Sequence, residues 1–484
     1  MELKGKADLK VVIMGGGPAG LAAGKILTDY NVKCLVFEQD DGVGGLSRTH
    51  SHQGFLFDLG GHRFFTKKNE LDRFIQRLLV DELIDVRRSS KIYFLNKYFN
   101  YPPTLFNAFI GMGPGISAQI LLSFLQEKIR GQTRPAITLE DWMVSQFGRK
   151  MYQIFFKDYT EKVWGIPCAQ GSAIWAAQRI KGMSLLSTLR EILFPGRKDR
   201  PVSLIPHFKY PAHGIGRISE RLKQEIEKKN EVRLNSRVSR ILHDGKKITG
   251  VRIQTRAGQE YLESATEYLS SIPVTELIQI FDPPAPPEVI AASKQLRYRD
   301  LLICVLMFAS EPITRDTWIY IPAPEIEFGR LHEPTNWSPA MSPPGKTSLV
   351  FEYFCFETDP IWKMPDEKII EKTIAQLARI RLAPGAEKNI IGHCVVRARK
   401  AYPIHELGRE GDLEIIKNFV KGFPNLTLMG RYGMFIYNNL DHSMESGIRA
   451  AQNLCGARRD LEEVLKRDEY LEIKYPEDDR EKKV

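Results

Sequence analysis

The first apolar positions of the chain fall into two short runs on either side of a segment with helical spacing. Residues 11–14 form a continuous apolar run that is typical of a strand, and residues 32–37 form a second β-like run. Between them, the Ala and Leu residues of 21–27 follow a helical pattern. The order strand, helix, strand predicts that the chain opens with an α/β unit.

Four glycines stand between this first strand and the helix, and three of them, Gly15, Gly17 and Gly20, have the spacing G-x-G-x-x-G. Gly15 permits a tight turn, Gly17 lets the backbone approach a pyrophosphate, and Gly20 lets the helix pack close to the strand. The helix N-terminus then faces the phosphate charge, and Glu38, which ends the second strand, can accept hydrogen bonds from ribose hydroxyls. Because the strand and the helix flank the glycines, the pattern favours a dinucleotide site over a chance glycine-rich turn.

A second glycine-rich segment follows. Gly44 and Gly45 can bring the backbone close to the same cofactor, and Arg48 can neutralise phosphate, although an ordinary turn before a hairpin has the same pattern. Residues 54–62 are typical of a strand that ends in Gly60 and Gly61, where a flat ring can lie against the backbone. The second segment therefore favours the cofactor interpretation of the first.

Further along the chain, helical and strand-like segments are interleaved. Helical periodicity predicts helices at 139–147, 151–156, 174–180, 185–192, 366–382 and 442–454. Strands are predicted at 232–238, 240–242, 248–255, 301–309, 348–356 and 425–429. The proline-rich stretch 283–287 marks a crossing between two domains.

One stretch, residues 98–126, contains no charged side chain, and its part 116–125 is strongly apolar. Its length is sufficient to span a bilayer, but several prolines and glycines interrupt it. We expect a buried helical hairpin here, with peripheral membrane contact as an alternative.

Composition and charge exclude several classes of protein. The six cysteines are scattered without a C-x-x-C pair, which favours reduced thiols in the cytoplasm and argues against a disulfide scaffold or a metal site. The N-terminus has no signal-peptide pattern. The formal net charge is +10, but no basic stripe is interleaved with aromatic residues, so nucleic-acid binding is not expected. An anionic substrate agrees with the charge, as does a solvated basic surface.

Several motifs together resemble a known family. Residues 15–20, Glu38, 44–45 and 58–62 resemble the FAD-binding signature of the amine oxidase and protoporphyrinogen oxidase-like flavoproteins. Within these, the chain is most similar to the UDP-galactopyranose mutase branch, over 60–65, 162–167, 175–179, 330–339 and 430–443. Trp337 and Leu440 depart from the mutases of eukaryotes, which carry Tyr and Gln there, and the departures leave the nucleotide and the sugar open.

The resemblance implies an α/β architecture: a Rossmann-type FAD-binding domain with interleaved helical and mixed-sheet substrate domains. The expected FAD-binding parts are 1–95, 206–290 and 396–484, the last with a C-terminal tail. The expected substrate parts are the mostly helical segment 96–205 and the sheet and helix of 291–395.

The same resemblance assigns residues to the cofactor and the substrate. The cofactor residues are Gly15, Gly17, Pro18, Ala19, Gly20, Glu38, Gly44, Gly45, Leu46, Arg48, Gly60, Gly61, His62, Val238, Gly430, Arg431, Asn438, Asn439, Leu440 and Ser443. The residues expected at a nucleotide-diphosphate sugar are Trp164, Arg179, Arg330, Trp337, Tyr402 and Tyr437. The four aromatic residues among them can equally be core positions. His62 and Arg431 are the expected catalytic residues, both beside the flavin.

The activity that the resemblance implies is interconversion of pyranose and furanose sugars through an adduct between the sugar and N5 of reduced flavin. NAD(P)H is the expected external reductant. Two converging arginines favour this interpretation, because apolar or cationic substrates give no reason for them. An FAD-dependent oxidoreductase of amines, porphyrin precursors or carotenoid-like substrates is the alternative, and a degenerate FAD-binding protein is a third. Assembly as a homo-oligomer stays open.

Overall fold

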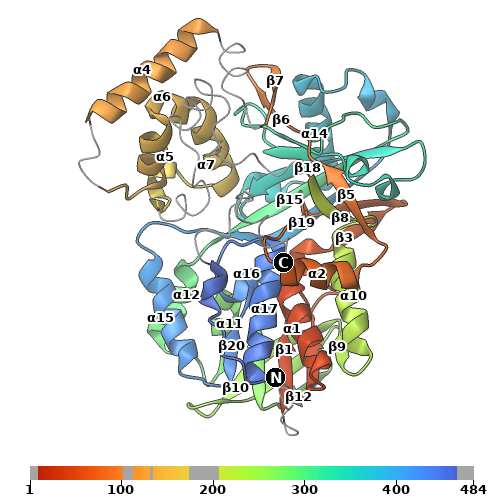
Figure 1. Ribbon diagram of the computed structural model, residues 1–484, viewed down its shortest axis with the longest axis vertical. Helices are drawn as coiled ribbons and strands as arrows, with labels where there is room; N and C mark the ends of the chain where they lie inside the picture. The colour runs from red at the N-terminus through yellow and green to blue at the C-terminus, as the bar shows by residue number, and fades with distance from the viewer. Residues whose placement is uncertain (1–8, 102–112, 131–134, 174–206, 466–484) are drawn as a thin grey trace, which may run out of the picture.

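The computed structural model describes residues 9–101, 113–130, 135–173 and 207–465. Two large sheets lie one above the other in Figure 1, with a group of helices at one corner. The lower part combines the red N-terminal and blue C-terminal segments, so the two ends of the described chain build one domain. The upper right part holds the second sheet, and the upper left part holds the helices.

The lower domain is built on a five-stranded sheet in the order β20-β13-β1-β2-β9, in which all neighbouring strands are parallel. The strands are β1 (Lys10–Met14), β2 (Lys33–Phe37), β9 (Glu231–Arg233), β13 (Glu267–Ser270) and β20 (Leu426–Leu428). Parallel strands of this kind are covered on both faces, which explains why the run in β1 is apolar without alternation.

Each face of this sheet has its own core. Val11 and Ile13 belong to the core formed with α1 (Pro18–Asp29), α10 (Gly216–Glu227) and α17 (Leu440–Leu454). The alternate residues of β1 pack on the other face, against a four-stranded sheet and three helices. These elements are β10 (Ser236–His243), β11 (Ile248–Thr255), β12 (Glu260–Glu263), β14 (Phe281–Asp282), α11 (Val274–Gln279), α12 (Pro287–Gln295) and α15 (Glu410–Lys421).

The upper domain is built on a seven-stranded mixed sheet in the order β19-β15-β18-β17-β16-β6-β7. Its strands are β6 (Ser90–Phe94), β7 (Lys97–Asn100), β15 (Tyr298–Phe308), β16 (Trp318–Tyr320), β17 (Arg330–His332), β18 (Thr347–Cys355) and β19 (Ile390–Pro403). The helix α14 (Asp366–Ile380) packs on one face of this sheet. The central strands β15 and β18 are buried along their whole length.

The helices at the corner of Figure 1 are α4 (Pro114–Arg130), α5 (Leu139–Phe147), α6 (Arg149–Met151), a π-helical turn (Tyr152–Lys157) and α7 (Asp158–Trp164). A capping box formed by Thr138 and Asp141 starts α5. The remaining elements connect the parts: β3 (Thr49–His52), β4 (Phe55–Asp58), α2 (Asn69–Leu78), β5 (Leu83–Arg87), β8 (His207–Pro211), α13 (Pro360–Lys363) and α16 (Gly430–Gly433).

The structure confirms the α/β class and most predicted elements, with two differences among the described residues. The strand expected at 232–238 is split into β9 and β10, which lie in different sheets because the chain turns at Asn235, whose φ is +52°. In the uncharged stretch, Tyr98 lies on β7, and α4 keeps Leu122 and Leu125 exposed, so the expectation of a buried hairpin is wrong for these described residues. The helices expected at 174–180 and 185–192 lie outside the described residues.

The expected domain bounds stay predictions. The β6–β7 hairpin joins the upper sheet and crosses the bound at 95/96. The strand β19 crosses the bound at 395/396. No helix in the part of the chain that the structure describes has both the length and the apolar character needed to span a membrane.

Candidate flavin and substrate site

The glycine turn between β1 and α1 has the geometry that a cofactor phosphate needs. Gly15 has a φ of +105°, and its N–H donates to the carbonyl of Phe37 at 2.8 Å. A Cβ on Gly20 would stand 2.0 Å from the carbonyl oxygen of Gly15, so only glycine lets α1 approach β1 this closely. A Cβ on Gly17, in contrast, would meet no atom within 4 Å, which leaves open space at the start of α1.

The carboxylate of Glu38 lies beside this turn. It is 8% exposed, and it accepts hydrogen bonds from the N–H of Gly16 at 2.7 Å and of Asp40 at 3.0 Å. Burial raises the pKa of Glu38, and these two N–H groups act against that rise. Each carboxylate oxygen keeps a second lone pair, so the group can still accept a ribose hydroxyl.

The second glycine segment packs on the first. The N–H of Gly44 donates to the carbonyl of Gly16 at 2.9 Å, and both Gly44 and Gly45 have positive φ. Leu46 follows in the same turn. Arg48 forms an ion pair with Asp41 at 2.6 Å, and its guanidinium lies directly beside Gly42 of this segment.

The C-terminal segment completes the lower part of the site. Gly430, with a φ of +73°, approaches Ala19 of α1, and its N–H donates to Ser446 Oγ at 2.8 Å. Ser443 Oγ donates to Asn438 Oδ1 at 2.7 Å. The amide nitrogen Nδ2 of Asn438 is buried and has no hydrogen-bond partner among the described residues.

An unpaired buried donor at the start of α17 and open space at the start of α1 are what a dinucleotide with a flat ring requires of this surface. The residues present therefore fit FAD. Pro18 begins α1, Asn439 precedes α17, Leu440 begins it, and Val238 lies in the apolar core on β10.

The segment after β4 connects the two domains. Gly60 has a φ of +109°, and a Cβ there would stand 3.1 Å from Oε2 of Glu352. His62 follows, and burial lowers its pKa to about 4, with the guanidinium charges of Arg431 and Arg330 adding to the effect. His62 is therefore a neutral imidazole at physiological pH.

Arg330 is oriented by a fully buried carboxylate. Its Nε donates to Glu352 Oε1 at 2.7 Å, its Nη2 donates to Oε2, and Glu352 is 0% exposed. Burial acts to raise the pKa of Glu352, but Arg330 and His332 hold it at about 2. The pair faces Gly61, where a Cβ would lie 3.8 Å from the guanidinium carbon of Arg330.

An aromatic group stands on the other side of the site. The rings of Tyr402 and Tyr437 are stacked at 5.5 Å, and Trp164 packs edge-on against both. The guanidinium of Arg431 lies 4.9 Å from the ring of Tyr437 and donates to the carbonyls of Ala401 and Asn438. Arg431 thus connects the α16 turn, which leads to α17, with the end of β19.

Trp337 differs from the wall of a sugar pocket that the resemblance implies. It is 3% exposed, its Nε1 donates to the carbonyl of Thr317 at 2.7 Å, and it lies among Phe208, Tyr210 and Trp318. One edge of its ring comes under Gly61. Arg179 lies outside the described residues, so the expected second arginine is not placed.

Three further side chains, two cationic and one aromatic, lie beside the site, and the sequence patterns assigned none of them to it. Arg63 and Arg88 both lie 4.9 Å from the ring of Trp318. Tyr159 of α7 packs edge-on against Tyr320 at 5.7 Å. Burial lowers the pKa of Arg63 to about 10, and the charge of Arg88 adds to the effect. Its position directly after His62, within the segment 60–65, was the sequence feature that could have indicated Arg63.

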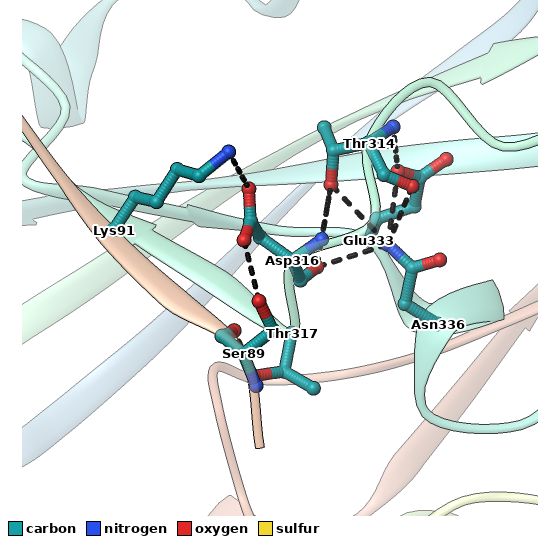
Figure 2. A network of polar contacts seen from close by, with 7 residues as sticks. All are labelled: Ser89, Lys91, Thr314, Asp316, Thr317, Glu333 and Asn336. Carbon is teal, nitrogen blue, oxygen red and sulfur yellow. Dashed lines mark hydrogen bonds and ion pairs between the residues drawn. The ribbon is translucent and has the colours of Figure 1, made fainter. Parts of the chain in front are cut away.

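A polar network, shown in Figure 2, holds the strands beneath these side chains in register. Asp316 accepts a hydrogen bond from Ser89 Oγ at 2.7 Å and forms an ion pair with Lys91 at 3.1 Å. These two contacts connect β6 to the segment before β16. Glu333 accepts the N–H of Thr314 at 2.7 Å and ties the same segment to the end of β17. The network fixes the strand that carries Trp318 beside the strand that follows Arg88.

Comparison with solved structures shows that this fold is known. A crystal structure of reduced UDP-galactopyranose mutase superposes with a TM-score of 0.83 at 24% identity, over 95% of this chain and 96% of that one. A putative protoporphyrinogen oxidase from Exiguobacterium sp. 255-15 has a TM-score of 0.71 at 18% identity, over 93% and 99%. At these identities the likeness shows the shared fold.

Curated relatives match over shorter regions. UDP-galactopyranose mutase from Mycoplasma genitalium is 25% identical over 166 residues, 33% of this chain and 40% of that protein. All-trans-retinol 13,14-reductase from Danio rerio is 46% identical over 55 residues, 11% of this chain and 9% of that protein. The chain thus matches less than half the length of either relative.

The family model described as flavin containing amine oxidoreductase matches residues 18–455, from the first residue of α1 to the residue after α17. This range contains the second glycine segment, the seven-stranded sheet and every strand of the five-stranded sheet except β1, which lies just before it. The chain therefore belongs to the flavin-containing amine oxidoreductase family, with a fold shared by UDP-galactopyranose mutase.

Proposed function

We propose that the protein is a flavin-dependent mutase that interconverts the pyranose and furanose forms of a nucleotide-diphosphate sugar. The observation that carries the proposal is Arg330, held rigidly by the buried Glu352 beside Gly60 and Gly61. A guanidinium fixed in this way can bind phosphate oxygens with its remaining donors. A site for a neutral or cationic amine gives no reason for a fixed cation next to the expected flavin position.

The residues around Arg330 have separate roles in this proposal. The glycine turns, Glu38 and the start of α17 hold FAD, which when reduced supplies the nucleophile. Arg330 and Arg179 bind the diphosphate, and Tyr402 and Tyr437 bound the same space. Trp164 closes the aromatic side, and NAD(P)H or another reductant keeps the flavin reduced.

His62 and Arg431 act next to the flavin ring. Because the pKa of His62 is about 4, its imidazole is neutral and can accept or donate a hydrogen bond without bringing a positive charge. Arg431 supplies the positive charge, which stabilises electron density on the reduced ring. In this proposal His62 provides a hydrogen bond to the flavin, and Arg431 provides the positive charge.

An FAD-dependent oxidoreductase is the second candidate, because the family as a whole is named for amine oxidation. The stacked pair of Tyr402 and Tyr437 is compatible with it, since two aromatic rings also suit an amine substrate. The two candidates differ in whether anions or cations bind beside the flavin.

The test uses the FAD-loaded protein reduced with dithionite. UDP, GDP and dTDP sugars are titrated while flavin fluorescence is followed, and products are separated by chromatography. We expect ring-size isomerisation only with reduced flavin, and a loss of about 100-fold in kcat/KM for Arg330→Met. Arg252→Met is the matched control, because Arg252 is an exposed arginine on β11. Turnover of amines or porphyrinogens by the oxidised protein, without nucleotide-sugar binding, would establish the second candidate instead.

A further inference from the structure

Lys162 is a partly buried cation at the start of the motif 162–167, and neither the resemblance nor the proposed chemistry assigns it a role. It lies on α7, and its ammonium donates to three backbone carbonyls: Ile321 at 2.8 Å, Ala323 at 2.7 Å and Ile326 at 2.7 Å. Three donors thus meet three acceptors, and all three acceptors belong to the connection between β16 and β17. An ammonium has no further donor to give, so this is its complete set of hydrogen bonds.

The backbone carbonyl of Lys162 also accepts a hydrogen bond from the seven-stranded sheet. Arg299, on β15 and 6% exposed, donates from Nη2 to the carbonyl of Lys162 at 3.2 Å and to that of Phe354 at 2.6 Å. The stem of Lys162 passes close to Gly329, where a Cβ would stand 3.5 Å from its Cδ and 2.8 Å from the ring of Phe354. A side chain at 329 would therefore disturb this junction.

Burial lowers the pKa of Lys162 to about 8, and the carboxylates of Glu325, Asp158 and Glu327 act against that decrease. At pH 7 most Lys162 side chains are therefore protonated, and the protonated ammonium has all three N–H donors. The three carbonyls compensate for the lost hydration of the ammonium, which is the condition for a stable buried charge.

The two segments that Lys162 joins carry the walls of the proposed substrate site. On one side, α7 carries Tyr159 and Trp164, three residues before Lys162 and two after it. On the other side, the connection leads from Tyr320 at the end of β16 to Arg330 at the start of β17. Tyr159 packs edge-on against Tyr320, and Arg330 contributes to the electrostatic environment of Tyr159.

We propose that Lys162 is a positioning residue for this site. By holding α7 to the connection 321–326, it fixes Tyr159 and Trp164 relative to Arg330 and to the tyrosine pair on the flavin side. The assignment of these side chains to substrate rests on the proposed function, but the positioning itself does not. Lys162 touches neither the expected flavin position nor the reacting atoms, so it acts through the groups that it places.

The test compares Lys162→Met, Lys162→Gln and Lys162→Arg with wild type, all loaded with FAD. Lys157→Met is the matched control, because Lys157 is an exposed lysine one turn earlier on the same helical segment. Three quantities are measured: the Kd of UDP from flavin absorbance of the oxidised protein, KM and kcat for the nucleotide sugar, and hydrogen exchange of the amides of 321–329. Flavin content and the melting temperature report whether each variant folds.

We expect Lys162→Met to raise the Kd of UDP and the KM by about tenfold, with kcat changed less than about threefold, because small displacements of binding groups are costly. Exchange at 321–329 accelerates in this variant, while the central strand β15 keeps its protection. Lys162→Gln, which retains two donors, is intermediate and covers the case in which the methionine variant does not fold. Lys162→Arg recovers most of the affinity, and Lys157→Met equals wild type.

A purely structural role gives a different result: lower melting temperature with unchanged Kd and KM, and this outcome overturns the proposal. If wild type binds none of UDP, GDP and dTDP, the proposed function fails, and hydrogen exchange then decides the inference alone. Faster exchange at 321–329 in Lys162→Met still supports positioning of this connection, and unchanged exchange overturns it.

Discussion

The change Glu352→Gln removes one charge from the centre of the proposed site and keeps the shape of the side chain. Glu352 is fully buried and pairs with Arg330 through both carboxylate oxygens, while His332 Nδ1 lies 3.4 Å from Oε1. Glutamine would turn an amide N–H₂ towards a guanidinium that also donates. The arginine would then be a largely buried cation with one acceptor instead of two.

The size of the effect follows from the pKa of the carboxyl group. A value of about 2, against an ordinary 4.5, corresponds to roughly 3 kcal/mol, since each tenfold change in an equilibrium is worth about 1.4 kcal/mol. Breaking a buried ion pair by removing one partner typically costs about 3–5 kcal/mol, which is the same range. We therefore expect Glu352→Gln to lower the free energy of unfolding by about 3 kcal/mol at pH 7.

The dependence on pH gives the effect a second signature. Because the folded-state pKa of Glu352 lies below the unfolded value, its stabilisation is complete above about pH 4.5 and is lost as the pH falls towards 2. The difference between wild type and variant should thus shrink by roughly 1 kcal/mol between pH 7 and pH 3.5.

The assay is urea unfolding of the FAD-loaded proteins, followed by tryptophan fluorescence at both pH values. Glu260→Gln is the control, because Glu260 is a half-exposed carboxylate on β12 with Arg252 3.9 Å away, and we expect it to change stability by less than about 0.5 kcal/mol. The KM for the nucleotide sugar should rise about tenfold in Glu352→Gln only, because Arg330 loses its orientation. A variant as stable as wild type at pH 7, or a difference that does not shrink at low pH, would refute the reasoning.

Three further predictions concern the cofactor turn and two buried titratable groups. Gly17→Ala should fold normally, because its Cβ meets no atom within 4 Å, but should bind FAD at least about tenfold more weakly, as the 450 nm absorbance of the purified protein will show. Asp58 is buried, and burial raises its pKa to about 6, so ionising it costs stability. Between pH 7 and pH 5 the free energy of unfolding of wild type should therefore rise by about 1 kcal/mol relative to that of Asp58→Asn, measured by urea unfolding. An equal pH response of the two proteins would contradict this. His62, with a pKa of about 4, should give no inflection in kcat between pH 5.5 and 8, and an inflection near 6.5 that disappears in His62→Asn would show that it is protonated there.

The sequence by itself determined those parts of the site that are built from residues close together in the chain. The turn from Gly15 to Gly20 and the acid at Glu38 are local: steric crowding at the turn requires glycine, and the strand that ends just before Glu38 runs parallel to the one before the turn. The buried strands β15 and β18 were equally readable, because strands covered on both faces contain near-continuous apolar runs, such as residues 301–308 of β15.

The tertiary structure decided which distant residues meet. Arg330 and Glu352 are paired by the register of β17 and β18, and nothing in either segment alone specifies that partner. The same holds for Lys162, whose acceptors are backbone carbonyls about 160 residues away and carry no side-chain signature. Trp337 is a further case: the sequence left a pocket wall and a core position open, and packing against Tyr210 and Trp318 makes it part of the core. Long-range pairing depends on sheet order and burial, which a local pattern does not encode.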